Sequence, residues 1–245
     1  MVKSAIELAA KAHDGQFRKG TSIPYIAHPC NVGVLLAEQG CTTTVICAGI
    51  LHDVIEDTAI TIADLRQQFG RKVASIVEKC SEPDKSLPWR ERKQHTIEYL
   101  AKAPLDVKLI SCADKFDNIL SIERDYQKEG EELWSRFNAS KEDQQWYYHG
   151  LVRSLGKGKF AKSPLYGYFK ESVFEVFGTP DSHESESALN YLYFDKDGAI
   201  FRKTKNASGI GIEDVKTPTG WKPYEGDRLA PVYYGDSISE EEANR

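Results

Sequence analysis

A short apolar stretch of the chain carries four ionisable residues at helical spacing. The run Gly49-Ile-Leu-His-Asp-Val-Ile-Glu-Asp-Thr58 contains His52, Asp53, Glu56 and Asp57. Burying such groups is costly unless something compensates their charge, and a divalent metal ion is a common compensation. In a helix, Glu56 would lie one turn after His52, and Asp57 one turn after Asp53. The pattern predicts a metal ion with a carboxylate directly beside it, which suits metal-assisted hydrolysis.

Two further residues join His52 and Asp53 to give four expected metal ligands. They are His28, His52, Asp53 and Asp114. They come from separate predicted helices or helix starts, so they can share one ion only if those helices pack together. Mixed imidazole and carboxylate ligands suit Mn²⁺, with iron or another divalent first-row metal as alternatives, and they exclude a structural thiolate zinc site. Taken alone, His28 could be a hydrogen-bonded core or capping residue, and Asp114 could belong to a buried salt bridge.

The elements that must position these residues are predicted to be helices. Apolar positions recur at helical spacing through the first part of the chain, and Gly and Thr residues supply stop and capping signals. We expect helices over residues 5–12, 32–37, 45–55, 61–70, 72–80, 90–102, 104–119, 140–155 and 164–177. The helix after Pro104 is apolar around most of its circumference, so it should lie at the centre.

The helical spacing of apolar residues ends after Gly178-Thr-Pro180. The aromatic and apolar segments 191–194 and 199–201 are predicted to be two short strands, and Asp197-Gly198 between them favours a hairpin turn. We therefore expect a mainly α protein, with a helical domain over residues 1–178 and a small β-rich appendage or tail over residues 179–245.

Composition restricts the class of partner and the compartment. The net charge of −5 argues against nucleic acid as the main partner. A small anionic molecule is compatible with it, because a metal ion and a few cations can dominate one cleft. The five cysteines form no CxxC pair, which favours a reduced cytoplasmic setting, with Cys47 and Cys112 in the core. No segment has the pattern of a signal peptide or a membrane span, and nothing in the sequence defines an oligomeric state.

Four motifs, in this order and spacing, resemble the RelA/SpoT hydrolase branch of the HD superfamily. They are Gly15-Gln-Phe-Arg-Lys19, Pro24-Tyr-Ile-Ala-His-Pro29, Leu51-His-Asp-Val-Ile-Glu-Asp-Thr58 and Cys112-Ala-Asp-Lys-Phe-Asp-Asn-Ile119. The resemblance is clear over residues 1–125 and becomes weaker towards residue 178. This branch includes small stand-alone alarmone hydrolases, to which the chain is similar in length.

The resemblance implies an HD-domain helical bundle, a manganese ion and a defined reaction. In that reaction the 3′-pyrophosphate of guanosine tetra- or pentaphosphate is removed, which gives GDP or GTP plus pyrophosphate. The four metal ligands expected from the residues match the family's ligands, and the resemblance implies that Glu56 and Asp57 handle the attacking water.

The resemblance also implies a nucleotide site. Arg18 and Lys19 match the basic pair near the nucleotide, and Asn118 matches the asparagine that contacts its sugar or base region. The chain departs from the family at Leu120 and Ser121, where polar nucleotide contacts are often found. The resemblance therefore defines the reaction, but it does not define which nucleotide base the site prefers.

Two alternative functions stay open. The same metal chemistry could act on another substrate, such as an adenosine alarmone, a nicotinamide nucleotide phosphate or a 3′-modified nucleic-acid end. The chain could instead be an antitoxin of a toxic alarmone synthetase, which would be its toxin partner, acting by hydrolysis of the product or by binding through residues 180–245. The intact set of metal-ligand candidates argues against neutralisation by binding alone.

Overall fold

The computed structural model describes residues 1–81 and 86–179 and, beyond them, the strand residues 191–196, 199–204, 214–217, 220–223 and 236–238. The chain divides into two compact units, Met1–Phe169 and Lys170–Arg245. The expected domain boundary after residue 178 stays a prediction.

Helices build the first unit, as the sequence predicts. They are α1 (Val2–Ala12), α2 (Ala27–Glu38), α3 (Thr43–Ile50), α4 (Val54–Asp57), α5 (Ile62–Cys80), α6 (Trp89–Lys102), α7 (Leu105–Glu129), the 3-10 helix η1 (Gly130–Arg136), α8 (Lys141–Leu155), the 3-10 helix η2 (Gly158–Lys162) and the start of α9 (Pro164–Phe177). None of the helices in the described residues combines the length and the apolar character that a membrane span requires.

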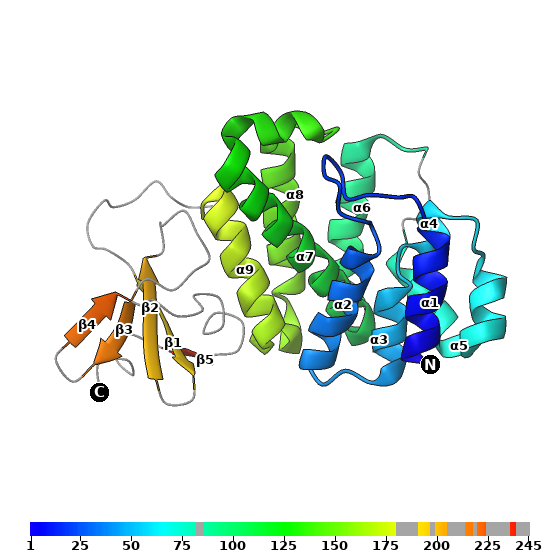
Figure 1. Ribbon diagram of the computed structural model, residues 1–245, viewed down its shortest axis with the longest axis horizontal. Helices are drawn as coiled ribbons and strands as arrows, with labels where there is room; N and C mark the ends of the chain where they lie inside the picture. The colour runs from blue at the N-terminus through cyan, green and yellow to red at the C-terminus, as the bar shows by residue number, and fades with distance from the viewer. Residues whose placement is uncertain are drawn as a thin grey trace. The chain divides into compact units, whose positions relative to one another are not determined.

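The long helix α7 lies at the centre of this unit, which confirms its predicted place. It packs against α2, α3 and α5, while α6 packs against α8 (Figure 1). Its side chains Ile110, Phe116 and Ile119 are almost completely buried. Such burial of large apolar side chains is the main favourable term in folding. The polar residues that interrupt the same helix are therefore held inside the bundle rather than on its surface.

Local signals in the sequence explain several helix ends. The Thr42 side chain accepts a hydrogen bond from the backbone N–H of Val45 and caps α3. Thr61 and Asp64 form a capping box at the start of α5. Gly70 has a φ of +87°, a conformation that glycine adopts without strain, and it kinks α5 where a helix end was expected.

The predicted helix over residues 45–55 is wrong in one respect that concerns the site. It is divided into α3, which ends at Ile50, and the single turn α4, so His52 and Asp53 lie in the connection between them. The carbonyl of Gly49 accepts a hydrogen bond from Nδ1 of His52 at 2.7 Å. In a continuous helix that carbonyl would accept the N–H of Asp53. Competition from the histidine side chain is a sufficient physical reason for the break.

The second unit contains a five-stranded sheet in the order β4-β3-β2-β1-β5. Its strands are β1 (Tyr191–Lys196), β2 (Ala199–Thr204), β3 (Asp214–Thr217), β4 (Gly220–Pro223) and β5 (Asp236–Ile238). β1 and β2 pair antiparallel, with Phe194 opposite Phe201. This confirms the two predicted strands and their pairing, while the turn at 197–198 lies outside the described residues.

Candidate metal centre and its cleft

Two histidines and one aspartate converge from three parts of the chain. His28 lies in the first turn of α2, His52 follows α3, and Asp114 lies in the middle of α7. The Nε2 atoms of His28 and His52 are 3.3 Å and 3.8 Å from Oδ1 of Asp114. One ligand atom from each of the three residues lies within 4.8 Å of the others, and all three side chains are buried. The predicted convergence of separate helices is therefore present.

Hydrogen bonds fix which ring nitrogen each histidine presents to this group. Nδ1 of His52 faces the Gly49 carbonyl at 2.7 Å, and Nδ1 of His28 faces a carboxylate oxygen of Asp117 at 2.6 Å. Both partners can only accept, so Nδ1 carries the proton in both rings. Nε2 is then the atom available to a cation, as is usual for metal-binding histidines whose other nitrogen is held by a second partner.

Asp53, the fourth expected ligand, lies directly against both histidines of this group. Its Oδ2 atom is 3.0 Å from Nε2 of His52 and 3.7 Å from Nε2 of His28. The same oxygen accepts a 2.5 Å hydrogen bond from the hydroxyl of Tyr25. Burial and the neighbouring Asp53 carboxylate raise the pKa of Tyr25, so the phenol stays protonated and remains a donor.

The charges within the group support one another. Burial alone would raise the pKa values of Asp53 and Asp114, but the first is lowered by His52 and the second by Lys115 and both histidines. Burial would lower the pKa values of His28 and His52, but the surrounding aspartates raise both. The aspartates therefore carry negative charge, and the group attracts cations.

The donor set fits a divalent metal ion. Imidazole nitrogens together with carboxylate oxygens suit first-row divalent ions, and no thiolate belongs to the group among the described residues. Within the part of the chain that the structure describes, buried Nε2 of His52 makes no hydrogen bond of good geometry, although Asp53 and Asp114 oxygens lie 3.0 Å and 3.8 Å from it. A buried nitrogen of this kind is costly unless a ligand engages it. His28, His52 and Asp114 thus form a candidate divalent-metal site.

The two carboxylates expected to act on water follow Asp53 directly. Glu56 is partly buried and Asp57 is exposed, both in the single turn α4. Burial raises the pKa values of Tyr25 and Cys80, and the charge of Asp57 adds a smaller increase at Tyr25 as that of Glu56 does at Cys80. Both carboxylates therefore lie close to the group, and their roles stay predictions.

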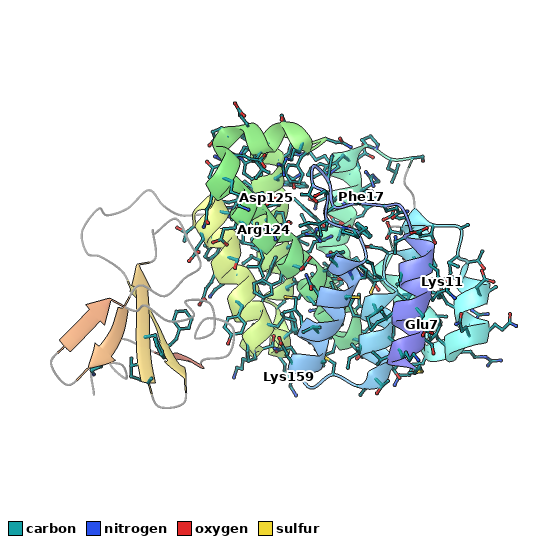
Figure 2. All side chains as sticks on the ribbon, viewed as in Figure 1. Glu7, Lys11, Phe17, Arg124, Asp125 and Lys159 are labelled. Atoms are coloured by element: carbon teal, nitrogen blue, oxygen red, sulfur yellow. The ribbon has the colours of Figure 1, made fainter. Side chains whose placement is uncertain are left out.

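A cleft of about 280 Å³ opens beside the metal group. Among the described residues that line it, the cations are Arg18, Lys19, Lys93, Lys115 and Arg136, and the acid is Asp125. Figure 2 labels Asp125 on α7, where it pairs with Arg136 at 3.2 Å. Aromatic rings of Trp89, Phe137, Tyr147 and Tyr148 complete the walls. Cationic and aromatic walls suit a ligand with an anionic part and a flat ring.

All three expected nucleotide-binding residues line this cleft. Asn118 donates a 2.7 Å hydrogen bond to Oδ1 of Asp114. Arg18 pairs with Asp117 at 2.7 Å. Lys19 donates to Asn138 at 3.2 Å. Arg18 and Lys19 follow Phe17, which is 57% exposed and is labelled in Figure 2 on the loop after α1. Their assignment to the nucleotide stays a prediction.

Three residues of the site carried no predicted role. Tyr25 holds Asp53, Lys115 pairs with Asp114 at 2.8 Å, and Asp117 joins His28 to Arg18. All three lie inside the motifs 24–29 and 112–119. Position in a motif was the only signal for Tyr25 and Asp117, because their partners are distant in sequence, whereas Lys115 pairs with the residue directly before it.

Comparison with known proteins defines the family. A model of the HD domain matches residues 5–145, which is more than half of the chain, and the chain belongs to the HD-domain family. The metal group and most of the cleft lie within the matched residues.

Curated relatives are homologous over about half of the chain. The guanosine-3′,5′-bis(diphosphate) 3′-pyrophosphohydrolase MESH1 of Drosophila melanogaster is 39% identical over 121 residues, which are 48% of this chain and 67% of that protein. The bifunctional (p)ppGpp synthase/hydrolase SpoT of Escherichia coli K12 is 38% identical over 127 residues, which are 49% of this chain and 18% of that protein.

Two solved structures share the fold. One is lmo0812 from Listeria monocytogenes, with a TM-score of 0.59 and 36% identity, covering 62% of this chain and 99% of the other. The second is a metazoan ortholog of SpoT that hydrolyzes ppGpp and plays a role in starvation responses. It has a TM-score of 0.57 and 31% identity and covers 71% of this chain and 93% of the other.

Proposed function

We propose that this chain is a metal-dependent (p)ppGpp 3′-pyrophosphohydrolase, which converts guanosine tetra- or pentaphosphate to GDP or GTP plus pyrophosphate. The observation that carries the proposal is the convergence of His28, His52 and Asp114, with Asp53 beside them, next to a cationic cleft. The homology to MESH1 and SpoT hydrolases supports the substrate class.

The metal would be held by His28, His52, Asp53 and Asp114, and we propose Mn²⁺ as the resident ion. A bound divalent ion lowers the pKa of water and polarises a phosphoryl oxygen. The residues around it keep the ligands in place: Tyr25 holds Asp53, and Gly49 holds the ring of His52. A pre-arranged ligand set reduces the cost of ordering when the ion binds.

Proton transfer is assigned to the carboxylates of α4. Water attacks the phosphorus bound to the ribose 3′-oxygen, the O3′–P bond breaks, and pyrophosphate leaves the nucleotide. Glu56, with Asp57, accepts the proton of the attacking water and returns it to the 3′-oxygen, which departs with the nucleotide as a hydroxyl group. The partly buried position of Glu56 beside the metal ligands fits this role better than the exposed position of Asp57.

The cleft is assigned to the nucleotide. Arg18 and Lys19 neutralise phosphate oxygens, since a guanidinium forms bidentate contacts with phosphate and an ammonium acts as a point charge. Asn118, which already contacts Asp114, would face the ribose close to the reacting 3′-oxygen. The concentration of cations in this cleft explains how a chain of net charge −5 binds a polyanion.

The direct test is incubation of the manganese-loaded protein with ppGpp, with GDP and pyrophosphate as readouts and Asp53→Ala as the inactive control. Metal-dependent release by the unmutated protein alone supports the proposal. Absence of release from protein that demonstrably binds Mn²⁺ would overturn the substrate assignment. A panel with adenosine alarmones and nicotinamide nucleotide phosphates then identifies the correct substrate.

A cytoplasmic location and a toxin partner also stay predictions. If the chain protects cells from an alarmone synthetase, hydrolysis and binding are distinguished by one variant. Asp53→Ala should fail to rescue growth if protection comes from hydrolysis, and it should rescue growth if protection comes from binding.

A further inference from the structure

We propose that Asp117 is a positioning residue that holds a metal ligand and a substrate-binding cation in one fixed arrangement. It would set the ring of His28 for the metal ion and the guanidinium of Arg18 for the nucleotide. This inference rests on the proposed function, because it takes the roles of His28 and Arg18 from there.

The contacts of Asp117 are short and come from distant parts of the chain. Its Oδ2 atom accepts hydrogen bonds from Nδ1 of His28 at 2.6 Å and from a terminal nitrogen of Arg18 at 2.7 Å. Its Oδ1 atom accepts from Nδ2 of Asn31 at 2.8 Å. The Asp117 side chain is 11% exposed. A carboxylate buried to this extent needs such partners, and here both oxygens have them.

The contact with His28 determines what the ring offers to a cation. Because the Asp117 oxygen accepts from Nδ1, Nε2 of His28 is free of a proton when the ring is neutral and points towards Asp114, 3.3 Å away. A carboxylate behind a metal-bound histidine fixes its tautomer and orientation and raises its basicity. Loss of such a partner typically weakens metal binding by about 10- to 100-fold.

The contact with Arg18 determines the shape of the cleft wall. Arg18 belongs to the loop between α1 and α2, and it is tied to the central helix α7 by this ion pair. The Arg18 side chain is 13% exposed, so the pair is shielded from most of the screening that weakens surface pairs. A guanidinium has five N–H donors in a rigid fork, so one end can pair with Asp117 while the other meets phosphate oxygens.

One oxygen serves both partners, and this makes the two sites interdependent. Movement of Asp117 towards either partner would lengthen its contact with the other. Substitution of Asp117 should therefore affect metal binding and nucleotide binding together, whereas substitution of Arg18 should affect mainly nucleotide binding.

The first experiment measures binding of Mn²⁺ alone to the full chain, by calorimetry or by the electron paramagnetic resonance of free Mn²⁺. Asp117→Ala should bind Mn²⁺ about 10- to 100-fold more weakly than the unmutated protein. Asp117→Asn keeps the shape of the side chain and one accepting oxygen, so its Mn²⁺ affinity should lie between those of Asp117→Ala and the unmutated protein. Asp64→Asn removes the same charge from the exposed capping box of α5 and should leave Mn²⁺ affinity unchanged. Unchanged affinity in Asp117→Ala and Asp117→Asn overturns the proposal.

The second experiment measures kcat and KM for ppGpp at saturating Mn²⁺. Asp117→Ala should raise KM, and Arg18→Ala in that background should raise KM by less than it does in the unmutated protein. Independent, multiplicative effects would show that Asp117 does not position Arg18 and would overturn that half of the proposal.

Loss of folding and failure of the proposed function have separate signatures. If Asp117→Ala does not fold, Asp117→Asn provides the test, since it keeps the volume of the side chain. If the unmutated protein does not hydrolyse ppGpp, the proposed function fails while the Mn²⁺ titration still decides whether Asp117 positions His28.

Discussion

Asn118 donates a 2.7 Å hydrogen bond to Oδ1 of Asp114, one helical turn earlier on α7. This contact joins a residue of the cleft to a candidate metal ligand. The same Asp114 oxygen lies 3.3 Å and 3.8 Å from the Nε2 atoms of His28 and His52. A hydrogen bond therefore joins the cleft to the metal group, and a substitution in one should be measurable in the other.

Asn118→Ala should raise the KM for ppGpp by about tenfold, which corresponds to the loss of roughly 1.4 kcal/mol, a typical net value for one hydrogen bond. Asp114 would also lose a donor that orients it, so a smaller decrease in Mn²⁺ affinity should accompany the change. Steady-state kinetics at saturating Mn²⁺ separate the two effects. The matched control is Asn138→Ala, which removes the contact of Asn138 with Lys19. This variant should change KM less.

Tyr25→Phe should weaken Mn²⁺ binding by about tenfold or more without abolishing it. The hydroxyl of Tyr25 donates to Asp53 at 2.5 Å, and removal of an outer partner of a metal ligand has effects of this order. The measurement is a Mn²⁺ titration of the purified protein. Tyr99→Phe, at an exposed position on α6, should behave like the unmutated protein. Equal affinities for the two variants would exclude a role of Tyr25 in holding Asp53.

Helical spacing in the sequence predicted one part of the site, because residues at i and i+4 lie on one face of a helix. Asp114 and Asn118 illustrate this, since their side chains touch as the helical spacing indicates. The convergence of His28, His52 and Asp114 required tertiary packing, which spacing alone does not fix. The resemblance to a known family supplied that information.

The path of the chain at His52 and the role of Asp117 could not be predicted in this way. Helix propensity favours continuation of α3, but the side chain of His52 takes the carbonyl that the next turn needs. Asp117 contacts residues that lie 86 to 99 positions earlier in the chain. Contacts over such separations depend on how α2, the loop before it and α7 pack, and no local pattern encodes them.

Glu56→Gln should keep the metal ion and lower kcat by about 10²- to 10⁴-fold, the usual contribution of a general base. The amide has nearly the shape of the carboxylate but cannot accept the proton at neutral pH. Metal content and turnover must be measured on the same preparation, with Asp57→Asn in parallel. Full activity of Glu56→Gln together with a slow Asp57→Asn would transfer the role of the base to Asp57.

Stabilisation of the protein by Mn²⁺ should increase as the pH rises above the ordinary histidine value of 6.5. The aspartates around His28 and His52 raise the pKa values of both rings, so in the metal-free protein a cation must displace their protons. Raised histidine pKa values stabilise the metal-free fold below the unfolded value of 6.5, and this contribution is lost as the pH rises through the folded pKa values. The metal-free and metal-loaded proteins should therefore respond to pH in opposite directions.

Thermal unfolding with excess Mn²⁺ and with a chelator, at several values between about pH 6 and about pH 8, checks this prediction. The difference in Tm should widen with pH. His95→Gln replaces a histidine that lies on α6, outside the metal group, and should leave that trend unchanged. A difference in Tm that is constant over this range would show that the two rings are not protonated in the metal-free protein.

Gly49→Ala should destabilise the fold and disturb the metal group through the packing of α3 against α2. A Cβ atom at this position would lie 2.3 Å from the Cδ1 atom of Leu36 and 3.3 Å from a methyl group of Val32. Both side chains are completely buried, so α3 must move or the leucine must change rotamer, and overpacking of this kind costs about 1–3 kcal/mol. Because the Gly49 carbonyl holds His52, a shift of α3 should also weaken Mn²⁺ binding.

Chemical denaturation measures the change in stability of Gly49→Ala, and a Mn²⁺ titration measures the change in affinity. Gly167→Ala, where the added Cβ meets no atom within 4 Å, provides the control. A Gly49→Ala variant that loses stability but keeps its Mn²⁺ affinity would show that the core relaxes by repacking Leu36 rather than by moving α3.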